Sequence, residues 1–203
     1  SEWKQAVIAQ LNLVQHASNL YYTRPQAELA ALLCERTGAK KVFFSNSGAE
    51  ANECAIKAAR KYSYDRYGEG RFHIVTFKNS FHGRTMATLS ATGQDVMHRF
   101  FMPFLEGFSY AEPTAASVRA HCSDKTCAVL LELVQGEGGV RPLDKEEVRA
   151  IERYCKKNDI LLMIDEVQTG NGRTGTLYAY EQYEIHPDVV RTAKGLPGGL
   201  RLG

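Results

Sequence analysis

Residues 161–168 read LLMIDEVQ, an apolar run that ends in the carboxylate of Asp165. A short apolar run of this kind is typical of a buried β-strand, so Asp165 is expected at the C-terminal end of that strand. In an open α/β sheet, ligands bind outside the carboxyl ends of the strands. This stretch therefore predicts a mainly parallel sheet and also the edge of the sheet at which a functional site lies.

Segments of strand and helix character alternate on both sides of this stretch, which favours an α/β fold with helices on both faces of the sheet. Strands are expected at residues 41–44, 72–77, 128–132, 160–164 and 189–190. Helices are expected from residue 2 to about 16, from after 23 to 38, from 48 to about 65 and from 144 through 155. Asp144 and Glu147 predict a capping box at the start of the last helix.

The composition excludes several classes of protein. Lys and Arg total 25 against 23 Asp and Glu, so no basic excess favours nucleic acid as a partner. No apolar stretch is long enough to span a membrane, and the first residues, SEWK, lack the apolar core of a signal peptide. Five scattered cysteines suit free thiols in a reducing compartment, without the spacing of a metal site. We therefore expect a cytoplasmic protein with no metal, no nucleic acid and no membrane.

Ser47, Gly48, Ala49 and Glu50 lie between an expected strand and an expected helix. The ordinary interpretation is a capping box, in which Ser47 is the N-cap and Glu50 the reciprocal acceptor. Gly48 and Ala49 also carry no bulk, so their N–H groups are free to face an anion at the positive end of the helix. The motif predicts a well-capped helix and, in a ligand site, an anion cradle.

Two further motifs contain polar or aromatic residues near expected strand ends. FHGR occupies residues 81–84, where Phe81 is suited either to the core or to covering a flat heterocycle, and Arg84 either to the surface or to clamping a carboxylate. QGEGG occupies residues 135–139, where Glu137 is either a solvated carboxylate in a glycine-rich turn or a polar gate near a substrate. Neither motif decides the function alone.

Lys194 stands between an alanine and a glycine, downstream of Asp165. Taken singly, a strand-end aspartate is often a turn former and a lysine is usually on the surface. A carboxylate for a pyridinium nitrogen and a lysine for an aldehyde are, however, the two groups that hold pyridoxal phosphate and tune its electronics. Their occurrence together with the anion cradle and the aromatic–arginine pair favours a site for pyridoxal 5′-phosphate (PLP).

GNGRTG, at residues 170–175, formally matches the dinucleotide fingerprint G-x-G-x-x-G, with Asp188 at a suitable distance downstream. We reject this interpretation, because residues 165–169 separate the strand from the first glycine and begin with an acidic pair that would repel a pyrophosphate. No clear helix follows Gly175. The segment is predicted to be a loop.

Five motifs together resemble those of the class III aminotransferases: SGAEANE at 47–53, FHGRT at 81–85, QGEGG at 135–139, DEVQTG at 165–170 and AKGL at 193–196. NLYY at 19–22 and MATLSATG at 86–93 add to the likeness, which runs over essentially the whole chain. The resemblance implies PLP-dependent transferase fold type I and transfer of an amino group from N2-acetyl-L-ornithine to 2-oxoglutarate, in arginine biosynthesis. Family members that act on ornithine, succinylornithine or 4-aminobutyrate remain alternatives.

By the same resemblance, five residues would hold the ring of the cofactor. Lys194 would bond to the aldehyde and carry the proton of the substrate Cα, and Asp165 would bind the pyridinium nitrogen. Phe81 and Val167 would cover the two faces of the ring. Gln168 would donate to the phenolic oxygen.

The remaining implied roles concern the phosphate and the substrate. Ser47, Gly48 and Ala49 would cradle the phosphate of the cofactor. Arg84 would bind the substrate carboxylate, and Glu137 would be a gate beside the side-chain pocket. Small amino acids and 2-oxo acids would be the substrates, and a homodimer the assembly.

The chain also departs from the family pattern. Family members are roughly twice as long, so residues 1–203 are expected to be the large cofactor-binding domain, without the small C-terminal domain and part of the N-terminal segment. Leu133 replaces a usual proline, and Pro197 and Arg201 interrupt a stretch of small residues after Lys194. A truncated, non-catalytic fragment that binds the cofactor is therefore a second interpretation.

Overall fold

The computed structural model describes residues 1–18, 20–198, 200 and 202–203. The chain divides into two compact units, residues 1–44 and residues 45–203. Each unit is described by itself.

The first unit contains two helices, α1 (Glu2–Leu11) and α2 (Arg24–Thr37), and no described residue of either helix is buried. The α2 helix has Pro25 in its first turn and ends at Gly38, whose φ of 73° is left-handed, as predicted. The prediction that α1 extends to about residue 16 is wrong. The helix gives way to a turn in which the N–H groups of Leu13 and Val14 both donate to the carbonyl of Gln10.

The strand predicted at residues 41–44 is not formed, and the five-stranded sheet does not include this segment. A strand needs a neighbouring strand that satisfies its backbone groups. The backbone pairing begins one residue later, where Ser45 and Gly203 exchange two N–H···O bonds. Apolar content alone therefore gave a wrong strand here.

The second unit is built on a five-stranded sheet, and all of its strand pairs are parallel. The strands are β1 (His73–Phe77), β2 (Phe108–Ala111), β3 (Thr126–Leu131), β6 (Leu161–Asp165) and β7 (Val189–Arg191). Their order in the sheet is β2-β1-β3-β6-β7. A separate antiparallel pair consists of β4 (Val134–Gln135) and β5 (Arg141–Pro142). The predicted parallel sheet is confirmed, with β2 as a strand that the sequence did not predict.

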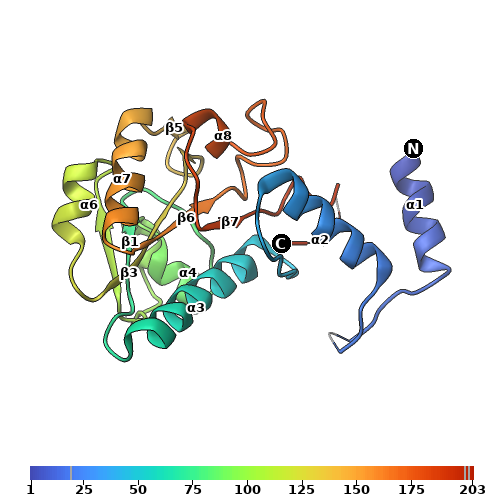
Figure 1. Ribbon diagram of the computed structural model, residues 1–203, viewed down its shortest axis with the longest axis horizontal. Helices are drawn as coiled ribbons and strands as arrows, with labels where there is room; N and C mark the ends of the chain where they lie inside the picture. The colour runs from blue at the N-terminus through green and yellow to red at the C-terminus, as the bar shows by residue number, and fades with distance from the viewer. Residues whose placement is uncertain (19, 199, 201) are drawn as a thin grey trace. The chain divides into compact units, whose positions relative to one another are not determined.

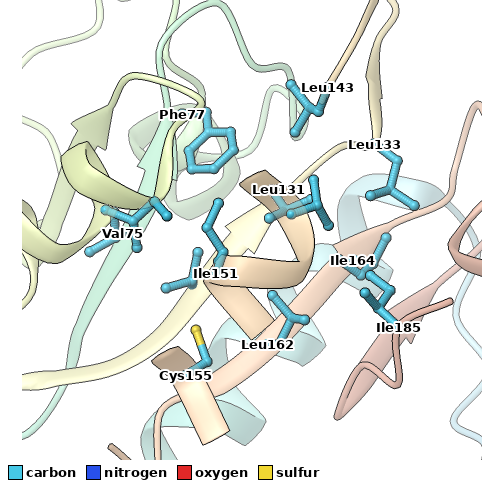
Figure 2. Close-up of a cluster of buried hydrophobic side chains, with 14 of the residues drawn as sticks. Val75, Phe77, Leu131, Leu133, Leu143, Ile151, Cys155, Leu162, Ile164 and Ile185 are labelled. Carbon is cyan, nitrogen blue, oxygen red and sulfur yellow. The ribbon is translucent and has the colours of Figure 1, made fainter. Parts of the chain in front are cut away.

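Helices cover both faces of this sheet (Figure 1). They are α3 (Gly48–Tyr67), α4 (Met86–Ala91), α5 (Asp95–His98), α6 (Ala115–His121), α7 (Lys145–Lys157) and α8 (Tyr180–Tyr183). One buried cluster joins the sheet to α6 and α7, and Ile151 of α7 lies in it with Leu162 and Ile164 of β6 (Figure 2). On the other face, Ile56 of α3 packs in a cluster with Met163.

The register of β6 decides where its last side chain points. Successive side chains of a strand alternate between the two faces of a sheet. Leu162 and Ile164 face the α7 layer, whereas Met163 lies in the cluster with α3. Asp165 follows Met163 by two residues and therefore lies on the α3 face, at the edge where all the parallel strands end.

Candidate active site

A cavity of about 390 Å³ lies at the carboxyl edge of the sheet. Its walls come from the start of α3, the loop after β1, the ends of β3 and β6, and the segment after β7. Nine of the ten residues predicted for the site line it: Ser47, Gly48, Ala49, Phe81, Arg84, Asp165, Val167, Gln168 and Lys194. Glu137 is not among the lining residues, but its Oε1 accepts a hydrogen bond of 3.2 Å from Gln168 Nε2.

Asp165 is buried at the end of β6 and is hydrogen bonded on both carboxylate oxygens. Its Oδ2 lies 2.9 Å from Asn52 Nδ2 and 2.9 Å from His82 Nδ1, and its Oδ1 accepts from the backbone N–H of Val167. Burial alone would raise the pKa of Asp165, but the bonds from His82 and Asn52 and the charge of Arg191 lower it to about 2. Asp165 is therefore a carboxylate that stays ionised in the protein interior, suited to holding a cationic nitrogen.

Asn52 and His82 are site residues whose roles the sequence did not predict. Asn52 lies one helical turn after Gly48 on α3, which brings its amide to the same side of the helix. Besides Asp165, the Asn52 amide donates to the carbonyl of His82 at 2.6 Å. Burial lowers the pKa of His82, which favours a neutral imidazole that donates to Asp165. The i, i+4 spacing from Gly48 was the signal that could have identified Asn52.

Glu132 is a second buried carboxylate, directly after β3, and it lines the same cavity. Its Oε2 accepts the backbone N–H of Phe81 at 2.9 Å, so it holds the start of the FHGR motif. Burial and the nearby charge of Asp165 raise the pKa of Glu132 to about 8. Glu132 is therefore mostly neutral at pH 7.

Arg191 was also missed, because an arginine at the end of a strand is usually expected on the surface. Its exposed fraction is 3%, and it is the register partner of Asp165 across β6 and β7. Partner residues in a parallel pair point to the same face of the sheet. The positive charge of Arg191 therefore lies on the same buried face as the Asp165 carboxylate.

The start of α3 is capped, as predicted, by Ser47, whose Oγ accepts the N–H of Glu50 at 3.2 Å. The Glu50 carboxylate accepts from Asn46 N–H at 2.6 Å, one residue earlier than a capping box requires. A Cβ on Gly48 would lie 2.9 Å from both methyl groups of Val167. The backbone at the start of α3 thus approaches the cavity wall more closely than any other residue type allows.

The FHGR motif forms a loop that depends on its glycine. Gly83 has a φ of 136°, and a Cβ there would lie 2.5 Å from Thr88 Oγ1. The guanidinium carbon of Arg84 lies 5.4 Å from the centre of the Phe81 ring, a cation–π distance. The loop thus places an aromatic face and an exposed guanidinium side by side at the cavity.

Lys194 follows β7 in a tight turn, closed by a 2.8 Å bond from Leu196 N–H to the carbonyl of Ala193. Residues 170–175 form turns, and the described chain after Gly175 enters no helix before Tyr180. This confirms the predicted loop, and the helix that a dinucleotide fingerprint requires is absent from this part of the chain.

None of the helices described is long and apolar enough to cross a membrane. In the described residues, no group of three or more His, Cys, Asp or Glu side chains is arranged to hold a metal ion.

A family model described as Aminotransferase class-III matches residues 2–203. Acetylornithine aminotransferase of Haemophilus ducreyi is 54% identical over 204 residues, which cover 100% of this chain and 52% of that protein. Succinylornithine transaminase of Photorhabdus laumondii is 43% identical over 203 residues, which cover 100% of this chain and 50% of that protein.

Solved structures are similar over the same length. N-acetylornithine aminotransferase from Stenotrophomonas maltophilia aligns with a TM-score of 0.85 at 35% identity, over 100% of this chain and 50% of that chain. A structure of ornithine aminotransferase from Toxoplasma gondii, described as having partial occupancy of PLP at its active site, gives a TM-score of 0.93 at 27% identity, over 98% and 49%. The chain therefore spans about half the length of the proteins that it matches.

Proposed function

Because the chain belongs to the class III aminotransferases, we propose that it binds PLP and that the protein transfers an amino group between an amino acid and a 2-oxo acid. The observation that carries the proposal is that Asp165, an ionised carboxylate, and Lys194 line the same cavity. Asp165 ends β6 and Lys194 comes shortly after the neighbouring strand β7, so the sheet itself brings these two segments together.

The cavity suits PLP in size and in chemistry. Asp165 offers a buried anion for the ring nitrogen, and Lys194 an amine for the aldehyde. The close approach of Gly48 to Val167 leaves a cradle that a Cβ would fill. This cradle lies at the N-terminus of the 20-residue helix α3, where free N–H groups favour an anion such as phosphate. When bound, PLP supplies an aldehyde for an amino group and a ring that draws electrons from the adjacent carbon.

The residues of the chain supply positioning and proton transfer. Asp165 would keep the proton on the ring nitrogen, because a carboxylate with a pKa of about 2 is ionised at neutral pH. The amine of Lys194 would take the proton from the substrate Cα and pass it to the cofactor carbon that carried the aldehyde. Phe81 and Val167 would cover the faces of the ring, and Gln168 would donate to its phenolic oxygen.

Two charged residues, Arg84 in the cavity wall and Glu137 hydrogen bonded to Gln168, are assigned to the substrate. Arg84 is exposed beside the Phe81 ring, where its guanidinium binds the substrate carboxylate through two parallel hydrogen bonds. Glu137 Oε1 accepts a hydrogen bond from Gln168 Nε2, which supports a gate role for this carboxylate beside the residue that would contact the ring oxygen.

N2-Acetyl-L-ornithine is the proposed amino donor and 2-oxoglutarate the acceptor, in arginine biosynthesis. The relatives named acetylornithine aminotransferase, at 48–54% identity, support this choice, and the succinylornithine transaminase at 43% supports the same type of donor. The ratio of kcat/KM values for acetylornithine, succinylornithine, ornithine and 4-aminobutyrate tests it. A larger kcat/KM for any of the other three donors would reassign the substrate.

A cytoplasmic homodimer is the proposed form of the protein. The apolar side chains of Phe100 and Met102, after α5, have exposed fractions of 93% and 72%, which suits a surface covered by another subunit. Light scattering coupled to gel filtration measures the assembly directly. A monomer at all concentrations would contradict the dimer.

The central test is covalent attachment of PLP. Added PLP is expected to give the visible absorption of a lysine-bound cofactor, and borohydride followed by mass spectrometry to locate the label on Lys194. Lys194→Ala abolishes the label, whereas Lys61→Ala, at an exposed ion pair on α3, leaves it unchanged. A label on another lysine would refute the assignment. Attachment without turnover would leave the chain a non-catalytic cofactor-binding subunit.

A further inference from the structure

The loop of residues 170–175 has no role in the proposed function. It lies against the segment that carries Lys194: an open cavity of about 790 Å³ is lined by five of its residues together with Lys194 and Gly195. The loop and the lysine segment therefore share a wall next to the proposed active site.

Asn171 joins this loop to the end of β7 with its side-chain amide. Its Nδ2 donates to Thr192 Oγ1 at 2.7 Å and to the carbonyl of Ala193 at 3.2 Å. The same Ala193 carbonyl accepts the N–H of Leu196 at 2.8 Å, the bond that closes the turn around Lys194. One amide therefore fixes the carbonyl on which the lysine turn is built.

The backbone on both sides of this contact has a positive φ. Lys194 has a φ of 29°, a conformation that L-residues rarely adopt and that persists only where the surrounding structure holds it. Asn171 has a φ of 58°, which asparagine tolerates better than most residues. The two segments are in contact as well as hydrogen bonded, since a Cβ on Gly195 would lie 3.0 Å from the Cβ of Asn171.

We propose that Asn171 is a positioning residue, which holds the turn of residues 193–196 so that the amine of Lys194 faces the PLP cavity. The inference rests on the proposed function for the bond between Lys194 and the cofactor. Asn171 acts only through Thr192 and Ala193. Its loss is expected to slow attachment at Lys194 without removing the site.

Two substitutions separate the amide from the backbone conformation. Asn171→Gly keeps access to positive φ and removes the amide, and Asn171→Asp keeps the size but cannot donate to the Ala193 carbonyl. Glu184→Gly is the matched control, because Glu184 also has a positive φ (54°) and lines neither cavity.

Two measurements are made on each variant. Hydrogen exchange of peptides spanning residues 192–197, without cofactor, is expected to be at least about tenfold faster in both Asn171 variants and unchanged in the control. Peptides of β3 report global unfolding in the same experiment. The rate of borohydride-trapped PLP attachment at Lys194 is expected to fall by about tenfold or more in both Asn171 variants.

The outcomes separate the inference from the function on which it rests. Unchanged exchange at residues 192–197 would overturn the positioning role, whether or not PLP binds. Faster exchange with an unchanged attachment rate would also overturn the positioning role, because Asn171 would then stabilise the turn without affecting the reaction at Lys194. If the unsubstituted chain attaches no PLP, the proposed function fails and the role toward Lys194 fails with it. If hydrogen exchange in β3 is also faster in Asn171→Gly, that variant is globally destabilised, and the positioning role is then judged from Asn171→Asp alone.

Discussion

Asp165 shows how a single carboxylate stays charged where water is excluded. Two of its bonds come from elements distant in sequence, the Asn52 amide on α3 and the His82 ring after β1. The ionised carboxylate contributes to stability at neutral pH, and that contribution is lost as the pH falls from near 4 towards about 2. The charge that would hold a pyridinium is therefore also part of the stability of the folded chain.

Glu132 gives the opposite pH dependence. Its folded pKa of about 8 lies above the ordinary 4.5, so between these values the folded chain binds a proton that the unfolded chain lacks. The contribution of Glu132 to the free energy of unfolding is therefore largest below about pH 4.5. It declines as the pH rises towards 8, by up to about 1.4 kcal/mol per pH unit. Glu132→Gln should remove that decline, as measured by urea unfolding from about pH 5 to 8. Parallel curves for the two proteins would refute the raised pKa.

Gly48 should not tolerate even one methyl group. In Gly48→Ala the new Cβ would meet the Val167 methyls at 2.9 Å, which is expected to cost about 1–3 kcal/mol of unfolding free energy. Affinity for PLP should fall as well, because the start of α3 must shift. Adding Val167→Ala to Gly48→Ala removes the contact. The double variant should therefore lose less unfolding free energy than the sum of the losses in the two single variants. Strict additivity would mean that the contact is not the cause.

At the scale of elements, α7 depends on its N-cap. Asp144 Oδ1 accepts the N–H of Glu147 at 3.0 Å, whereas the Glu147 carboxylate accepts the N–H of Ala115 at 2.6 Å and so holds the first residue of α6. The predicted capping box is therefore wrong in its second half. Glu147 connects two helices instead of closing one.

Asp144→Ala is expected to lower the free energy of unfolding by about 1 kcal/mol, because an N–H at the start of α7 loses its acceptor. Asp144→Ser retains an acceptor and should recover most of the loss. Urea unfolding of the three proteins measures both effects. Equal loss in the Ser and Ala variants would assign the effect to the charge of Asp144 rather than to its hydrogen bond.

The elements differed in how well the sequence predicted them. The fully buried β3 and the capped helices α3 and α7 were predicted, because a continuous apolar run or a cap residue defines each one. The β2 strand was missed, since its four residues are mostly half-buried and carry no strict alternation. Residues 41–44 were misassigned, because local apolar content does not show which strand could pair with them.

The site was predicted to the extent that its residues stand at element ends. Gly48 and Asp165 begin or end an element, and the ends of parallel strands meet at one edge. Asn52 and Arg191 were not predicted, because the bond from Asn52 to Asp165 depends on helix packing, and the position of Arg191 beside Asp165 depends on strand register. The partners of a buried charge are set by tertiary structure, which local patterns do not encode.

At the scale of the whole molecule, residues 45–203 contain both buried clusters. We expect these residues, expressed alone, to unfold in one cooperative transition, because the residues that form the core are all present. Circular dichroism and a dye that binds exposed apolar surface measure this. A broad transition with strong dye binding at neutral pH would show that residues 1–44 are needed for folding.

The strand order β2-β1-β3-β6-β7 has a kinetic consequence. No strand of the sheet pairs with its partner through a hairpin, and the edge of β1 that faces β3, at residues 73–75, stays unpaired until residues 126–129 are available. A topology with such high contact order folds slowly and leaves strand edges open to other chains in the meantime. Refolding yield should therefore fall steeply with protein concentration, and chaperones that shield nascent chains should raise it.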